Sequence, residues 1–127
     1  WRNIYMRSNS RELNLNEIIN MFNKVQYCRL AVCENNQPYV VPMSFRYKCE
    51  GNGFKFLFNS LNEGVKIKFL SRNSKVCIEF DRNVGNAIDS IIVIGSGRIF
   101  NDPCGDRSVI LEVISSKVTG KRTFLEI

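Results

Sequence analysis

The strongest constraint on the fold of this chain is the alternation of side chains between residues 39 and 47. Large apolar or aromatic residues occupy every second position of this stretch, namely Tyr39, Val41, Met43, Phe45 and Tyr47. A period of two is typical of a β-strand that packs one face against a core. Pro42 stands on the other face, and proline has no N–H to donate to a neighbouring strand. We therefore expect a strand at a sheet edge, or one bulged at Pro42, with exposed main-chain groups beside it.

Further short strands are predicted along the rest of the chain. The six strands expected cover residues 27–33, 39–47, 54–58, 76–80, 90–100 and 108–118. Gly, Asn, Asp and Pro gather between several of them, at residues 34–38, 51–53 and 101–105, as they do in turns. Six short strands with two helices favour a mainly β, antiparallel barrel over a parallel α/β sheet.

The first of the two helices is expected over residues 14–25. Asn14 and Glu17 have the spacing of a capping box, in which each side chain accepts a hydrogen bond from the other residue's N–H. Ile18, Phe22 and Val25 recur at helical intervals, so they are expected to face the core.

The second helix is expected over residues 61–72. Its inner face is predicted to carry Leu61, Val65 and Phe69. Ser60 and Glu63 repeat the capping-box spacing where a strand runs into this helix. A helix start presents free N–H groups and the positive end of the helix dipole, and Lys66 follows within a turn. We expect a phosphate to fit there, although such a box by itself usually does no more than cap a helix.

The composition indicates one domain. A chain of 127 residues, 44% of them hydrophobic, is long enough for one core. We expect a single domain over residues 1–127, with residues 1–13 as an N-terminal extension. Lys and Arg number 18 against 12 Asp and Glu, a net charge of +6, but the cations lie in small separate groups. That scatter favours an ordinary solvated surface over one that binds nucleic acid.

The cysteines bear on metal binding and on the cellular compartment. Five cysteines without a Cys-x-x-Cys pair, in a chain without histidine, match none of the usual zinc patterns, so no metal site is expected. Reduced thiols and a cytoplasmic setting are expected instead. Cys28 and Cys77 are predicted to pack as small hydrophobic residues, whereas Cys49 and Cys104 lie beside predicted turns. We expect neither a membrane span nor a signal peptide.

Several short motifs follow one another in a distinctive order. They are CRLA at 28–31, PYVVPMSF at 38–45, NS-x3-G-x-K at 59–66, SKVC at 74–77, IGSGR at 94–98 and VTGKR at 118–122. Together they resemble the pyridoxamine 5′-phosphate oxidase-like flavin-binding split barrels, most closely the nitroimidazole-resistance (Nim-type) branch. The resemblance implies a six-stranded antiparallel split barrel of the FMN-binding type, paired as a homodimer that holds FMN in the grooves between its subunits.

The resemblance also implies which residues bind FMN. They are Val41, Pro42, Met43, Ser44, Phe58, Asn59, Ser60, Val65 and Lys66. The first four would border the polar edge of the isoalloxazine ring through main-chain groups. The next three would border the ribityl chain and the phosphate, and Lys66 would pair with the phosphate.

Three departures from the family pattern affect this expectation. Val65 stands where the wider family commonly has Arg, which removes a charge-assisted contact worth about 1.5–3 kcal/mol. Asn59 stands where many Nim-type relatives have His, so chemistry that needs an imidazole there is in doubt. The short turn at 101–105 replaces a longer segment of the relatives, which would leave the groove more open or differently lined.

The function implied is that of an FMN-dependent oxidoreductase acting on nitroaromatic or other small aromatic compounds. The flavin would carry the electrons, and no catalytic side chain is assigned. Two alternatives stay open. One is a non-catalytic flavin- or haem-binding carrier or sensor that uses the same groove, and the other is a small basic β-barrel that binds nucleic acid.

Overall fold

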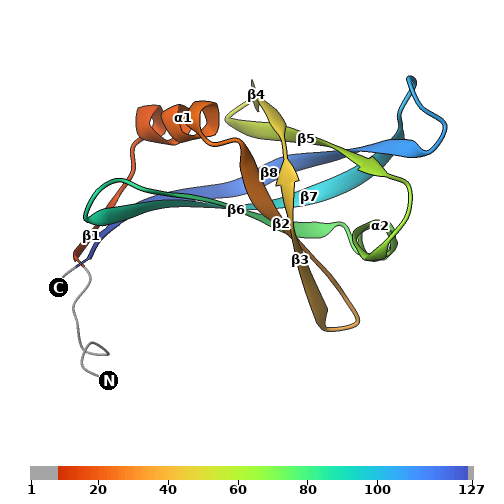
Figure 1. Ribbon diagram of the computed structural model, residues 1–127, viewed down its shortest axis with the longest axis horizontal. Coiled ribbons are helices and arrows are strands. Elements are labelled where there is room, and N and C mark those ends of the chain that lie inside the picture. The colour runs from red at the N-terminus through yellow and green to blue at the C-terminus, as the bar shows by residue number, and fades with distance from the viewer. Residues whose placement is uncertain (1–8, 126–127) are drawn as a thin grey trace.

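The computed structural model describes residues 9–125 as an antiparallel sheet with two helices (Figure 1). In chain order the elements are β1 (Asn9–Glu12), α1 (Leu15–Lys24), β2 (Tyr27–Glu34), β3 (Gln37–Ser44), β4 (Arg46–Glu50), β5 (Gly53–Leu61), α2 (Val65–Arg72), β6 (Lys75–Asn83), β7 (Ala87–Asn101) and β8 (Ser108–Phe124). The mainly β, antiparallel prediction is confirmed, and residues 9–125 contain eight strands where six were expected. Neither helix is long and apolar enough to span a membrane within residues 9–125.

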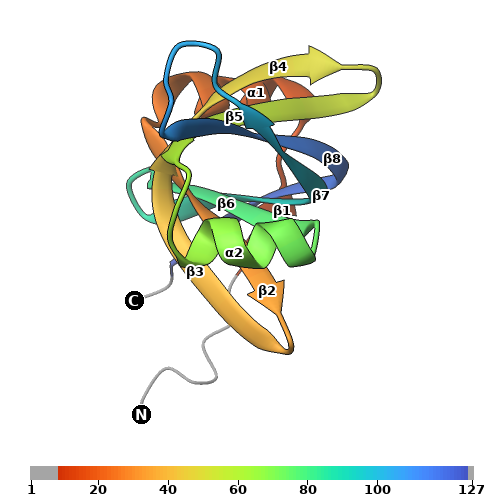
Figure 2. The same ribbon diagram turned by 90° about the vertical axis from the view of Figure 1, so that its right-hand side faces the viewer.

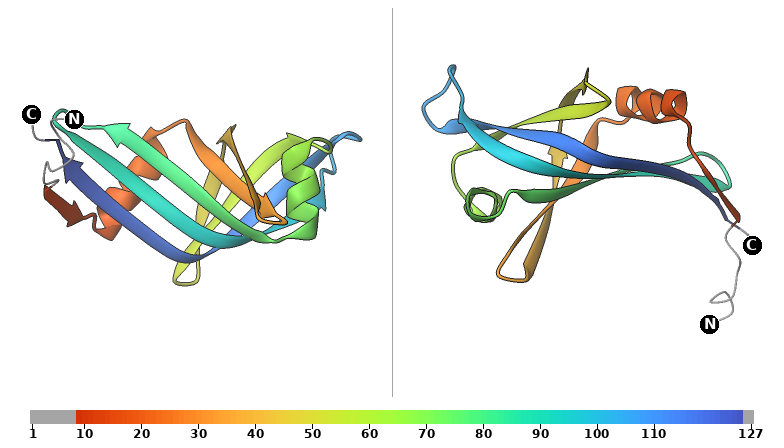
Figure 3. Two further views of the ribbon diagram at one scale, coloured as in Figure 1. Left: turned by 90° about the horizontal axis from the view of Figure 1, so that it is seen from below. Right: turned by 180° about the vertical axis from the view of Figure 1, so that it is seen from behind.

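The sheet curves into an open barrel. Its strand order is β3-β2-β6-β7-β8-β5-β4, and β1 pairs with the far end of β8. The first and last strands of this order, β3 and β4, do not pair with each other, so the barrel is not closed. Seen from one end, the strands wrap around a common centre (Figure 2). The helices lie near opposite ends of the long β7–β8 pair, on opposite sides of it (Figures 1 and 3).

The stretch with a period of two is divided between two strands. β3 ends at Ser44 and β4 begins at Arg46, so Phe45 connects the two ends of the sheet order. A break of one residue preserves the alternation of faces. The inner residues that pack against the core on both sides of it are Val41, Met43, Phe45 and Tyr47. Pro42 lies in a terminal strand, which confirms the expected edge position.

α1 covers the core with an aromatic contact. The Phe22 ring centroid lies 5.1 Å from that of Phe54, 5.3 Å from Phe56 and 4.7 Å from Phe80. Aromatic pairs at such separations contribute beyond the burial of their area.

The capping box of α1 is confirmed. Glu17 N donates to Asn14 Oδ1 at 2.9 Å, and Asn14 N donates to Glu17 Oε1 at 3.0 Å. The local sequence alone therefore located the start of this helix.

The second helix begins later than expected. α2 starts at Val65, and its N-cap is Gly64, at φ 96° and without a side-chain hydrogen bond. Ser60 and Leu61 extend β5 and pair with β8 instead. The expected capping box of Ser60 and Glu63 is therefore wrong, because pairing with β8 holds Ser60 in extended backbone.

The inner face of α2 also differs from the expected one. Leu61 and Val65 are 58% and 42% exposed, whereas Leu70 is buried and Phe69 packs against the core. Leu61, Val65 and Phe69 were expected on one face of a helix that began at residue 61. Because the helix begins at Val65, its buried residue is Leu70.

Four residues of the expected N-terminal extension form a strand. Asn9–Glu12 form β1, which pairs with residues 121–124 of β8. This strand has four polar or charged residues, NSRE, so no apolar alternation announced it. The rest of the expected extension, residues 1–8, lies outside the described residues.

All five cysteines are free thiols. Cys28 is buried, and burial raises the pKa of its thiol to about 12. Cys77 is half-buried, while Cys49 and Cys104 are exposed. The expected division between packed and turn cysteines is therefore confirmed, with Cys77 less buried than Cys28.

Candidate functional site

β3 presents an open edge of the sheet. In an antiparallel strand, the N–H and C=O of one residue point toward one neighbouring strand, and those of the next residue point to the opposite side. The Cys28 thiol lies 3.6 Å from the Met43 carbonyl oxygen, which places the main chain of Met43 on the side of β2. Pro42 and Ser44 have the opposite parity, so their main-chain groups face the open edge. This suits Pro42, which has no N–H to give to β2.

A groove of about 560 Å³ lies along the exposed face of β2 and β3. We call it the outer groove, and it is lined by Tyr27, Arg29, Val40, Val41 and Pro42. It therefore contains two of the predicted flavin-binding residues.

Arg29 is held in place in the outer groove. Its Nη1 donates to Glu79 at 2.9 Å and to Asp81 at 2.6 Å, and its guanidinium carbon lies 5.9 Å from the Tyr27 ring centroid. The pKa of Glu79 is raised, by burial first and then by its hydrogen bond with Asp81, and Arg29 offsets part of that rise. The charge of Arg29 is thus matched by carboxyl groups of β6.

A smaller hollow of about 230 Å³ lies where β3 passes into β4. We call it the Arg46 hollow, and it is lined by Ser44, Phe45, Arg46, Leu57 and Asn59. Arg46 Nη2 donates to Asn59 Oδ1 at 3.0 Å, which joins the start of β4 to the end of β5. The hollow brings together Ser44 and Asn59, two predicted site residues that are distant in the sequence.

The start of α2 is open to an anion. Its first main-chain bond runs from Lys68 N to Gly64 O, 3.1 Å long. The N–H groups of Val65, Lys66 and Ile67 come before it, and within residues 9–125 no side chain caps them. The first turn has no acidic residue, and a Cβ placed on Gly64 would meet nothing within 4 Å. Free amides, the helix dipole and the Lys66 ammonium all favour negative charge here.

The remaining predicted residues do not place their side chains in these hollows. Met43 packs against the core, and Phe58 is fully buried. Ser60 is 9% exposed, and its hydroxyl donates to Leu61 O at 2.8 Å. The side chains of Val65 and Lys66, in the first turn of α2, line neither the outer groove nor the Arg46 hollow.

Sequence reasoning missed six residues of these hollows, which are Tyr27, Arg29 and Val40 in the outer groove and Phe45, Arg46 and Leu57 in the Arg46 hollow. Tyr27 and Arg29 enter the outer groove because β2 pairs with β3, which the local pattern did not reveal. Arg46 could have been found, because it follows Ser44 by two positions and so keeps the same face across the break at Phe45.

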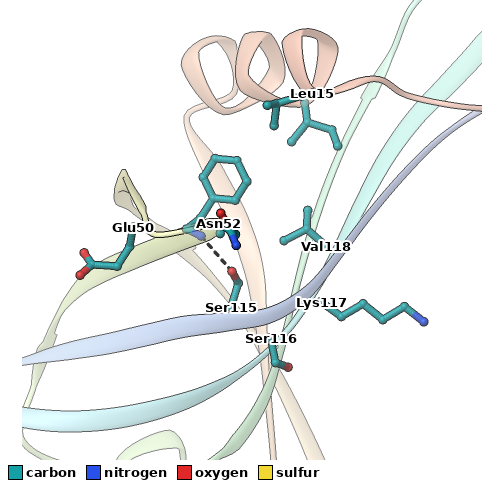
Figure 4. A pocket seen from close by; sticks show the side chains of 10 residues that line it. Leu15, Glu50, Asn52, Ser115, Ser116, Lys117 and Val118 are labelled. Atoms are coloured by element: carbon teal, nitrogen blue, oxygen red, sulfur yellow. Dashed lines mark hydrogen bonds between the residues drawn. The ribbon is translucent and has the colours of Figure 1, made fainter.

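A further pocket, of about 470 Å³, lies elsewhere (Figure 4). It is formed by the start of α1, the β4–β5 turn and the middle of β8, and none of the predicted site residues lines it. Ser115 Oγ accepts a hydrogen bond of 2.9 Å from Phe54 N, and Ser116 Oγ donates one of 3.1 Å to Ile94 O. Figure 4 shows Lys117 extending away from the other labelled side chains. The two serine hydroxyls of this pocket thus form hydrogen bonds within the sheet.

Comparison with known proteins gives matches among solved structures. No protein-family model and no curated protein matches the chain. A FAD-binding protein from Mesorhizobium loti has a TM-score of 0.79 at 20% identity, over 92% of this chain and 98% of its own. A candidate 5-nitroimidazole antibiotic resistance protein from Bacteroides thetaiotaomicron has a TM-score of 0.79 at 20% identity, over 93% of this chain and 90% of its own.

A third match extends over almost the full length of both chains. It is a candidate pyridoxamine 5′-phosphate oxidase from Corynebacterium glutamicum, with a TM-score of 0.70 at 16% identity, over 96% of this chain and 99% of its own. At these identities the likeness is one of fold. This chain has the split-barrel fold of the pyridoxamine 5′-phosphate oxidase-like proteins.

Proposed function

We propose that this chain binds FMN and acts as an oxidoreductase on nitroaromatic or other small aromatic compounds. The observation that carries the proposal is the uncapped start of α2. It presents free amides and Lys66 directly after β5. The FAD-binding structure of the same fold supports a flavin as the ligand.

The donor set suits both parts of FMN. The open edge of β3 offers the Pro42 carbonyl as an acceptor and the Ser44 N–H as a donor, which matches the mixed polar edge of an isoalloxazine ring. The start of α2 offers amides and an ammonium to the phosphate. When bound, the flavin would supply the electron transfer, and these residues would bind and orient it.

The exposed face of the sheet supports a homodimer with flavin at the subunit interface. Val40, Ala31, Cys77 and Ile94 are register neighbours across β3, β2, β6 and β7. Val40 is 61% exposed and Ile94 44% exposed. An apolar row of this kind is typical of an interface, and a second copy placed over it would also cover the outer groove.

A non-catalytic flavin carrier or sensor is the second candidate. The Arg46 hollow has no carboxyl or thiol side chain that could exchange a proton near pH 7. Binding without turnover would therefore be chemically consistent with this site. The five free thiols fit a reducing, cytoplasmic setting for either function.

The binding test uses purified protein incubated with FMN and then desalted. We expect visible flavin absorbance to remain with the protein, and chromatography of the released flavin to identify FMN rather than FAD. Lys66→Ala should weaken FMN binding about tenfold or more, because it removes a charge-assisted contact. Lys68→Ala, one helical position beyond the first turn, is the matched control and should bind as the original chain does. Protein that retains no flavin would refute the proposal.

Turnover separates the two candidates. Under anaerobic conditions with NAD(P)H, an oxidoreductase should reduce nitroaromatic or quinone acceptors when flavin is bound. Stable flavin binding with no reduction of any acceptor would favour the carrier or sensor.

A further inference from the structure

Arg46 differs from most arginines between residues 9 and 125 because it forms no ion pair with a carboxylate of that range. Within residues 9–125 the arginines that form ion pairs are Arg11, Arg29, Arg72, Arg82, Arg98 and Arg122. In that same range Arg46 and Arg107 form none. The partner of Arg46 is instead the neutral amide of Asn59, at 3.0 Å. A guanidinium always carries its charge, so Arg46 brings to its hollow a positive charge that has no ion-pair partner within residues 9–125.

Asp102 is the carboxylate whose pKa responds to Arg46, but the two form no ion pair within residues 9–125. The pKa of its carboxyl is lowered first by the hydrogen bond from Cys104 N and next by that from Ser108, while the charge of Arg46 contributes least. Both of these bonds are 2.9 Å long. Both carboxylate oxygens of Asp102 accept hydrogen bonds within their own turn, and among residues 9–125 Arg46 has no ion-pair partner.

The contact with Asn59 orients two kinds of donor toward one anion. Asn59 accepts through Oδ1, so its NH₂ group is free of Arg46 and available to a ligand. A guanidinium has five N–H donors in one plane, and Asn59 uses one of them. Both residues line the same small hollow, together with Ser44. Planar, paired donors of this kind suit the oxygens of a phosphate.

We propose that Arg46 contacts the phosphate of the bound flavin and determines the preference for FMN over riboflavin. This rests on the proposed function. The segment from Asn59 to Lys66 would then have a cation at each end, Arg46 held by Asn59 and Lys66 itself. A phosphate monoester with two negative charges is matched by two such cations, and Lys66 alone would supply one.

The test compares the affinities of FMN and riboflavin for the full chain. Quenching of flavin fluorescence gives both dissociation constants for the original chain, Arg46→Ala and the control Arg98→Ala. Arg98 is an exposed arginine of β7 that pairs with Glu112, outside the hollow. Arg46→Ala should weaken FMN binding about ten- to hundredfold and riboflavin binding less than about twofold. Arg98→Ala should change neither.

A second variant, Arg46→Gln, keeps a polar side chain at this position and removes the positive charge. FMN binding should again weaken, because the phosphate loses a cation, while riboflavin binding is kept. An equal loss of both flavins in Arg46→Ala, or no loss of either, would overturn the role of Arg46 while leaving flavin binding itself intact. An original chain that binds neither flavin would overturn the proposed function, and the role of Arg46 with it.

Discussion

At the scale of single residues, Asp89 is the charge most constrained by burial. Its side chain is 1% exposed, and it accepts hydrogen bonds from Arg122 Nε at 2.6 Å and Arg122 Nη2 at 2.8 Å. Arg82 lies on the other side, 3.9 Å away. The three residues are cross-strand neighbours on β6, β7 and β8. A buried carboxylate is tolerated only with such partners, so folding depends on this pair.

Removal of the Arg122 guanidinium tests that dependence. Arg122→Met should lower the free energy of unfolding by about 3 kcal/mol, because it leaves Asp89 buried with only the more distant Arg82. Urea denaturation measures the loss. Lys121→Met removes an exposed charge from the next position and should change stability by less than about 0.5 kcal/mol. Equal effects of the two changes would show that Asp89 does not need Arg122.

The lowered pKa of Glu17 predicts how the stability of the protein depends on pH. Arg11 donates to its carboxylate at 3.0 and 2.8 Å, and this hydrogen bonding, with that of Asn14 N next, lowers the pKa of Glu17 from 4.5 to about 2. A carboxyl whose pKa is lower in the folded state adds stability above its ordinary pKa. That stability is lost as the pH falls from 4.5 through about 2.

Melting temperatures across this pH range provide the measurement. Glu17→Gln should melt below the original chain near neutral pH, and the gap should shrink as the pH approaches 2. Glu63→Gln removes the same charge from an exposed loop position and is the control for the loss of one carboxylate. A Glu17→Gln difference that stays constant with pH would contradict the assignment.

At the scale of elements, a bulge sets how β7 and β8 pair. Ile94 lies opposite Lys117 whereas Gly95 lies opposite Ser115, so Ser116 is left without a register partner. Gly95 allows the close approach that results, since a Cβ there would lie 2.5 Å from the main-chain oxygen of Ile114. A main-chain atom in a long strand pair cannot move aside easily.

Two glycine substitutions on β7 should therefore differ. Gly95→Ala should destabilise the protein by about 1–3 kcal/mol through overpacking against the main chain. Gly97→Ala should cost less, because its Cβ would meet Leu70 Cδ1, the end of a side chain, at 2.9 Å. Unfolding in urea compares them, and a larger loss for Gly97→Ala would contradict the role assigned to the bulge.

The two helices show why element prediction succeeded once and failed once. Both starts have capping-box spacing. At Asn14 no strand partner competes, so the local hydrogen bonds form as the sequence predicts. At Ser60 the chain is still paired with β8, and Phe58 just before it is fully buried. Burial and ladder hydrogen bonds outweigh a cap that is typically worth about 1 kcal/mol.

At the scale of the whole molecule, the exposed apolar row is the feature that a single chain leaves unexplained. It crosses four strands, β3, β2, β6 and β7, and borders the outer groove. Isolated exposed apolar residues are common on proteins, but a continuous row is typical of a surface that a partner covers. The homodimer proposal therefore depends on this row.

A charge placed in the row should disrupt pairing. If the proposed dimer forms through this row, Ile94→Asp should make the protein monomeric at micromolar concentration, measured by light scattering, and should weaken flavin binding. Leu15→Asp is the control, since Leu15 is 61% exposed but lies on α1, away from the row. A monomeric original chain would contradict the dimer.

By itself the sequence determined what depends on neighbours in the chain: the strand periodicity, the cap of α1, the edge position of Pro42 and the mainly β class. Tertiary structure decided what depends on distant pairing. It divided residues 39–47 at Phe45, kept Ser60 in β5 and placed Arg46 against Asn59. The reason is physical, since local rules describe the preference of a segment in isolation, whereas strand pairing and burial select among those preferences.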